Sequence, residues 1–131
     1  MDRRRLYGEI RDLAEGGYNI EFNLNKGEVE ITGFEFPTGW EPRHGDLFYK
    51  IPGDYPNSVP AVYFSEGMSF RGSSRTHLHL RTGKDGYDKF CLHEFNWNPK
   101  KNTLITLTKV VVAGLNNPEA PNKALRKAGH V

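Results

Sequence analysis

The sequence predicts an α+β domain in which a helix lies at each end of an antiparallel meander of strands. Leu6, Ile10 and Leu13 recur at helical spacing, which predicts a helix over residues 3–15. Apolar and polar residues then alternate through the middle of the chain, as they do in half-buried strands. A second apolar segment of helical length follows at residues 103–115. Separate runs of helix and antiparallel strand are typical of the α+β class.

Local signals set the limits of the first helix and of four strands. Asp2 is a helix-capping residue type, and Gly16-Gly17 supplies a stop. The residues from Gly39 to Gly45 predict a polar loop. The expected strands are the two arms of a hairpin within residues 18–36 that turns at Asn25-Lys26-Gly27, a third strand from Asp46 to Ile51 and a fourth from Ala61 to Phe64.

The region after the fourth strand is less regular. Thr76–Leu80 and Tyr87–Leu92 are candidate extended segments on either side of the turn Lys84-Asp85-Gly86.

Residues 103–115 are rich in β-branched side chains, which favour a strand, but their length favours a helix. Thr103 as a cap and Asn116-Asn117-Pro118 as a terminator decide for the helix. Residues 122–131 are either a short docked helix or a frayed end.

Length and composition exclude several classes of protein. The chain of 131 residues fits a single domain over residues 1–131. It is 37% hydrophobic and 26% charged, and no window of the sequence is as apolar as a membrane span. The 18 basic and 16 acidic residues give a net charge of +2, which is too balanced to indicate a nucleic-acid partner. No apolar secretory segment follows Met1, so we expect a cytoplasmic protein. We also expect no membrane partner and no cofactor.

Three motifs occur in a fixed order. They are Pro52-Gly53-Asp54-Tyr55-Pro56 with Pro60 beyond it, Cys91-Leu92 with Trp97-Asn98-Pro99 beyond it, and Asn117-Pro118-Glu119-Ala120-Pro121. This order, after an N-terminal helix, resembles the ubiquitin-conjugating enzymes, and in particular their reduced prokaryotic members from ubiquitin-like conjugation operons. The resemblance implies the ubiquitin-conjugating (UBC) fold, in which a cysteine-bearing crossover precedes a helix packed on the sheet. By this resemblance we expect the C-terminal helices of eukaryotic members to be missing.

The resemblance also implies a reaction and its partners. Cys91 would accept a ubiquitin-like protein from an activating enzyme as a thioester and pass it to a lysine of a target protein. Glu119 would orient or desolvate that lysine. Arg3, Arg4 and Arg5 resemble the basic residues that family members present to the activating enzyme. Trp97 and Pro99 are better interpreted as core and turn residues than as catalysts.

One departure from the family concerns oxyanion stabilisation. The family carries His-Pro-Asn shortly before the cysteine, whereas this chain has no such motif. His93, two residues beyond Cys91, is the leading replacement, because an imidazole can lower a thiol pKa or donate to an oxyanion. His77 and His79 are the next candidates.

Other functions fit the same residues. His77, His79, Cys91 and His93 have the composition of a zinc site. A two-residue hairpin at Asp85-Gly86 would place residue 79 opposite residue 92 and separate the histidine pair from Cys91 and His93, whereas a loop of odd length would bring the four together. Alternatively, the domain is a non-catalytic adaptor in which Cys91 packs as a small apolar residue.

Overall fold

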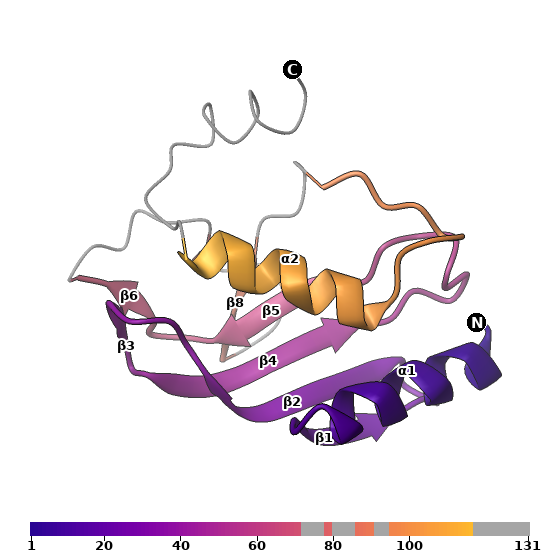
Figure 1. The fold of residues 1–131 in the computed structure, drawn as a ribbon, viewed down its shortest axis with the longest axis horizontal. Coiled ribbons are helices and arrows are strands. Elements are labelled where there is room, and N and C mark those ends of the chain that lie inside the picture. The colour runs from indigo at the N-terminus through magenta and orange to yellow at the C-terminus, as the bar shows by residue number, and fades with distance from the viewer. Residues whose placement is uncertain (72–77, 80–85, 91–94, 117–131) are drawn as a thin grey trace.

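The computed structural model describes residues 1–71, 78–79, 86–90 and 95–116, and it confirms the predicted α+β class (Figure 1). Two helices lie on one face of an antiparallel sheet, so the domain has two layers. Within these residues, neither helix is long and apolar enough to cross a membrane.

The elements follow one another much as the sequence indicates. The helices are α1 (Arg3–Glu15) and α2 (Leu104–Asn116), and the strands are β1 (Asn19–Asn23), β2 (Glu28–Glu35), β3 (Trp40–Glu41), β4 (His44–Lys50), β5 (Ala61–Ser65), β6 (Ser69–Phe70), β7 (Leu78–His79) and β8 (Tyr87–Phe90).

The main sheet extends beyond the predicted four-stranded meander. Its order is β1-β2-β4-β5-β8-β7, and each neighbouring pair is antiparallel. The meander therefore continues through β8, which pairs with β5 over residues 62–65 and 87–90. The segments predicted at 76–80 and 87–92 contribute only Leu78–His79 and Tyr87–Phe90 to described strands.

The prediction of a polar loop from Gly39 to Gly45 is wrong in part. This segment contains β3, which pairs with β6 in a small second sheet, and the first residues of β4. Trp40 is the cause, because its side chain is buried and its indole N–H donates to the Leu115 carbonyl at 2.8 Å. A buried tryptophan with a satisfied N–H holds this loop beneath the end of α2.

Both helices begin with the predicted capping residues. The Asp2 carboxylate accepts a hydrogen bond from the Arg5 amide, and α1 ends at Gly16. The Thr103 hydroxyl accepts from the amides of Ile105 and Thr106 at the start of α2. These contacts satisfy backbone donors that a helix leaves unpaired at its first turn.

One hydrophobic core lies between the sheet and the two helices. Burial alternates along β5 and the first half of β2, as expected where one face of a strand packs on the helices. The core includes Leu6, Ile10 and Leu13 of α1, Val29, Ile31, Leu47, Tyr49, Val62, Phe64 and Phe90 of the sheet, and Leu104, Leu107, Val111 and Leu115 of α2.

Candidate functional site

The predicted catalytic residues lie outside the described part of the chain. This holds for Cys91, His93 and Glu119, and also for His77. The structure does describe the residues on both sides of the Cys91 stretch. Phe90 is the last residue of β8 before it, and the chain is described again from Phe95 onwards.

The zinc alternative depends on the register of β7 and β8. His79 pairs with Lys89, whereas a two-residue hairpin at Asp85-Gly86 would pair residue 79 with residue 92. An odd number of residues separates His79 from Lys89, which is the kind of register that the zinc alternative requires. Among the described residues, no group of three or more His, Cys, Asp or Glu side chains is arranged to hold a metal ion.

The segment 95–102, which follows the Cys91 stretch, is packed against the turn that begins at Pro52. The indole N–H of Trp97 donates to the Pro56 carbonyl at 2.7 Å. The Trp97 ring lies between the rings of Tyr55 and Phe95, with centroid distances of 6.0 and 6.1 Å. Two of the sequence motifs, 41 residues apart, are therefore in direct contact.

The turn itself is held by its own backbone and by α1. The Tyr55 amide donates to the Pro52 carbonyl at 3.0 Å, and the Tyr55 carbonyl accepts from the Asp2 amide at 2.9 Å. The Ser58 hydroxyl donates to the Asp54 carboxylate at 2.7 Å. These bonds fix the carbonyl of Pro56 at the place where Trp97 meets it.

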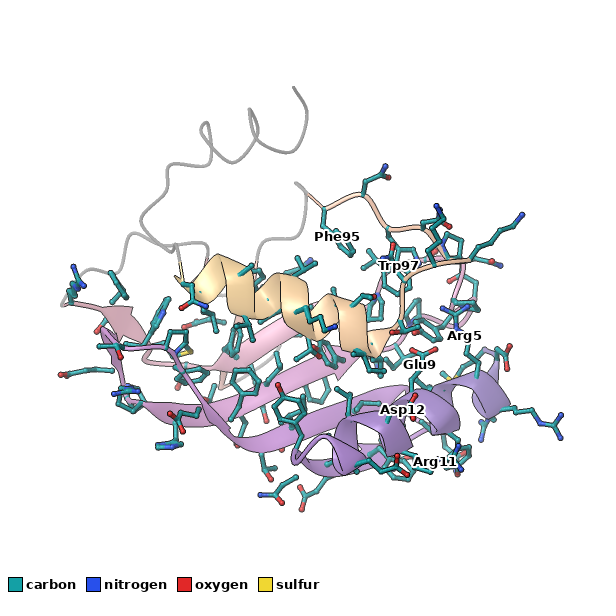
Figure 2. All side chains as sticks on the ribbon, in the orientation of Figure 1. Arg5, Glu9, Arg11, Asp12, Phe95 and Trp97 are labelled. Atoms are coloured by element: carbon teal, nitrogen blue, oxygen red, sulfur yellow. The ribbon has the colours of Figure 1, made fainter. Side chains whose placement is uncertain are left out.

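A buried carboxylate joins the turn and both helices (Figure 2). One oxygen of Glu9 accepts hydrogen bonds from the Tyr55 hydroxyl and from the Leu104 amide, the latter at 2.8 Å. The other oxygen accepts from Arg5 Nε at 2.7 Å. The Glu9 side chain thus lies at the N-terminus of α2, where a negative charge interacts favourably with the helix dipole.

Arg5 extends the same network to the segment 95–102. Its guanidinium donates to the Pro99 carbonyl at 2.7 Å and to the Asn102 carbonyl. Figure 2 shows Arg5 and Glu9 directed toward the segment that carries Trp97. The guanidinium therefore ties α1 to the chain that leads from the Cys91 stretch into α2.

The protonation state of Tyr55 suits this arrangement. The pKa of Tyr55 is raised above its usual range, mainly by burial of the phenol and secondly by its hydrogen bond to Glu9. The hydroxyl consequently remains a donor at any physiological pH. Glu9 accepts from three different elements, so each of its two oxygens has at least one donor of the protein.

The three predicted docking arginines do not share one environment. Arg5 is committed to Glu9 and to two backbone carbonyls, and its side chain is only 26% exposed. Arg3 and Arg4 are exposed on the first turn of α1. Arg3 donates to the Asn25 side chain at 3.2 Å. The structure thus separates a structural arginine from two surface arginines.

Sequence reasoning missed the role of Glu9. The signal was present, because Glu9 is three residues beyond Leu6 and next to Ile10, on the apolar stripe of α1. A carboxylate on such a stripe needs buried partners. Arg5, one helical turn earlier, was the partner that the spacing offered.

The network is a support and contains no nucleophile. The only cysteine of the chain is residue 91, so the described residues include no thiol. The network instead fixes the positions of residues 95–102 and of the start of α2 relative to α1.

Fold and site together define an α+β domain with a buried polar junction between α1, the turn around Tyr55 and the start of α2. Comparison of the chain with protein-family models, curated proteins and solved structures gives no match.

Proposed function

We propose that the chain is an acyl carrier of the ubiquitin-conjugating kind. Cys91 would hold the C-terminal carboxyl of a ubiquitin-like protein as a thioester and transfer it to a lysine amine of a target. One observation supports this most directly. The turn around Tyr55 and the Trp97-Asn98-Pro99 segment, which carry the sequence resemblance separately, pack against each other through the Trp97–Pro56 hydrogen bond and the Trp97–Tyr55 ring contact.

The chemistry requires two acyl transfers. In the first, the Cys91 thiolate attacks the thioester that the activating enzyme carries, and the enzyme's thiol leaves. In the second, a target amine attacks the Cys91 thioester, an amide forms, the Cys91 thiol is released and a base takes the amine proton. His93 is proposed as the oxyanion donor or thiol activator, and Glu119 as the residue that receives the lysine.

Arg3 and Arg4 are the proposed contacts for the activating enzyme. Both are exposed on α1 and form no salt bridge with a described acidic residue. Charge reversal of Arg3 and Arg4 should slow thioester formation and increase its sensitivity to salt, because exposed charges affect association more than stability. Lys109, which is exposed on α2, is the matched control. Equal effects of reversing Lys109 and the two arginines would reject the docking role.

The function is tested by isolating the tagged chain from its own cells under acidic, non-reducing conditions. We expect an adduct one small protein larger that disappears on thiol treatment. Cys91→Ala should abolish this adduct, and Cys91→Ser should replace it with a thiol-resistant ester or with no adduct. A thiol-sensitive adduct that persists in Cys91→Ala would reject the proposal.

His93→Ala separates the two acyl transfers. If His93 is the oxyanion donor, loading should persist while discharge to free lysine slows by about one to three orders of magnitude. If His93 lowers the thiol pKa, then loading and alkylation of Cys91 should slow together, and higher pH should restore both. A variant that matches the parent in all three rates would make His93 structural.

Two other functions have distinct outcomes. An adaptor would bind its partner equally well with Cys91→Ala and would form no covalent adduct. A zinc domain is favoured by the odd spacing between His79 and Lys89. It predicts about one zinc per chain in metal analysis of the purified protein and loss of that zinc in Cys91→Ala.

A further inference from the structure

Among the described strands, β1 forms an edge of the main sheet. It pairs with β2 over five residues, Asn19–Asn23, and no other described strand is its neighbour in the sheet order. Four of its five residues are exposed, and Ile20 is half-buried. Proteins commonly guard such an edge with a proline, a bulge or charged side chains, above all lysine. β1 contains no proline, lysine or bulge, and Glu21 is its one charged residue. Its outer backbone groups are therefore a template for another strand.

An exposed aromatic pair lies beside this edge. Tyr7 of α1 and Phe22 of β1 are 52% and 46% exposed, which makes them the two most exposed large hydrophobic side chains in the described part of the chain. Their rings meet edge to face, with centroids 5.7 Å apart and an interplanar angle of 88°. The pair thus forms a solvent-facing apolar platform at a sheet edge.

Three arginines surround Tyr7 on the surface of α1. Arg3 and Arg4 precede Tyr7 by four and three residues, and Arg11 follows it by four. Residues at these spacings are neighbours on the surface of a helix. All three are exposed, and none forms a salt bridge with a described acidic residue. Figure 2 shows Arg11 on the side of α1 opposite to Arg5. The platform therefore has a positive rim.

We propose that the edge of β1, with Tyr7 and Phe22 above it, binds an extended segment of a partner protein as an additional strand of the sheet. Backbone hydrogen bonds to β1 would supply affinity, and the platform would select apolar side chains at alternate positions. Acidic side chains on the same face of the segment would meet the arginine rim. On the other face, Glu21 favours a basic or neutral residue. The inference does not rest on thioester chemistry.

Charge disfavours a second copy of the chain as the occupant. Antiparallel pairing of β1 with itself over all five residues places Glu21 opposite its own copy, and directly opposed like charges destabilise a strand pair. The two α1 helices would also lie on the same face of the joined sheet, which would bring the exposed arginines of one copy to the same face as those of the other. A partner with acidic and apolar residues on one face avoids both conflicts.

The probe is a synthetic nonapeptide with valine at its third, fifth and seventh positions, glutamate at both ends, and alternating lysine and threonine between them. A peptide of the same composition in scrambled order is its control. We expect the first peptide to bind with a Kd below about 1 mM and to slow hydrogen exchange of the amides in Asn19–Asn23. The scrambled peptide should do neither.

Two variants test the two parts of the site. Phe22→Ser should weaken binding about tenfold, since it removes half of the exposed platform. Arg11→Glu should weaken binding about three- to tenfold at low salt and much less at 1 M salt, whereas Lys109→Glu should change it little. Because these side chains are exposed, all variants should remain folded, which near-ultraviolet circular dichroism checks.

Several results would overturn the inference. One is the absence of binding at 1 mM, and another is binding that leaves exchange in Asn19–Asn23 unchanged. Sedimentation of the free protein as a dimer whose β1 amides are already protected would assign the edge to a second copy. Equal effects of Arg11→Glu and Lys109→Glu would remove the arginine rim from the site.

Discussion

Removal of the Glu9 carboxylate should destabilise the domain far more than an ordinary helix substitution. Glu9→Ala leaves the Tyr55 hydroxyl and the Leu104 amide as buried donors without an acceptor. Each such donor costs about 1–3 kcal/mol. Arg5 also loses its ion pair, but it is 26% exposed and keeps two carbonyl acceptors, so its contribution is smaller.

The expected total is about 3–5 kcal/mol, which is the range measured when one partner of a buried pair is removed. That is a large part of the roughly 5–15 kcal/mol that holds a domain of this kind together. Glu9→Gln keeps an acceptor oxygen for Tyr55 and Leu104 and loses the charge facing Arg5. We therefore expect it to cost about 1–2 kcal/mol.

The assay is equilibrium unfolding in urea, followed by tryptophan fluorescence. Glu15→Ala is the matched control, because Glu15 is exposed on the same helix and should change the free energy of unfolding by less than about 0.5 kcal/mol. A double-mutant cycle of Glu9→Ala with Tyr55→Phe removes the shared hydrogen bond from either side, and we expect a coupling energy near 1 kcal/mol. If Glu9→Ala lies within 1 kcal/mol of the parent, the junction is not the support described above.

Two ionisable groups give predictions about pH. The pKa of Tyr87 is raised from 10.0 to about 12, mainly by burial and secondly by its hydrogen bond to Glu30. The folded state holds this proton more tightly, so its contribution to stability is complete below pH 10 and is lost as pH rises through about 12. Tyr87→Phe should therefore flatten the alkaline decline in unfolding free energy, and an unchanged slope would reject the assignment. Burial also raises the pKa of Asp88, against the opposing effect of the Gly67 amide. Asp88→Asn should stabilise the domain at pH 7. The gain should shrink as the pH falls through the unfolded-state pKa of 3.8 and vanish well below it, where the carboxyl is protonated in both states. An equal gain at pH 3 and pH 7, measured by urea unfolding, would contradict this prediction.

The sequence predicts the regular part of the fold well because local signals determine it. Asp2 and Thr103 cap the two helices as their residue types indicate. The alternation of apolar residues places β1 and β2, and the turn signals before them place β4 and β5. Each of these elements depends on spacing within a few residues of the chain.

The remaining features depend on contacts between distant residues. The pairing of β3 with β6 depends on Trp40 reaching the Leu115 carbonyl, which lies 75 residues further along the chain. The separation of Arg5 from Arg3 and Arg4 likewise depends on carbonyls 94 and 97 residues away. No local pattern reports such contacts, so a run of three arginines is interpreted from sequence as a single surface cluster.

The candidate site divides in the same way. The motifs around Tyr55 and Trp97 were recognisable from sequence, and the structure brings them together. The roles of Cys91, His93 and Glu119 remain predictions, because these residues lie outside the described part of the chain.

The most direct test of the acyl-carrier account is peptide mapping of the adduct isolated from cells, by mass spectrometry at low pH. The account predicts one modified peptide, in which the Cys91 sulfur is joined through a thioester to the C-terminal carboxyl of a small protein. It also predicts that hydroxylamine at neutral pH releases the two intact chains. An adduct that maps to any other residue, or Cys91 recovered as a free thiol from the adduct itself, would contradict it.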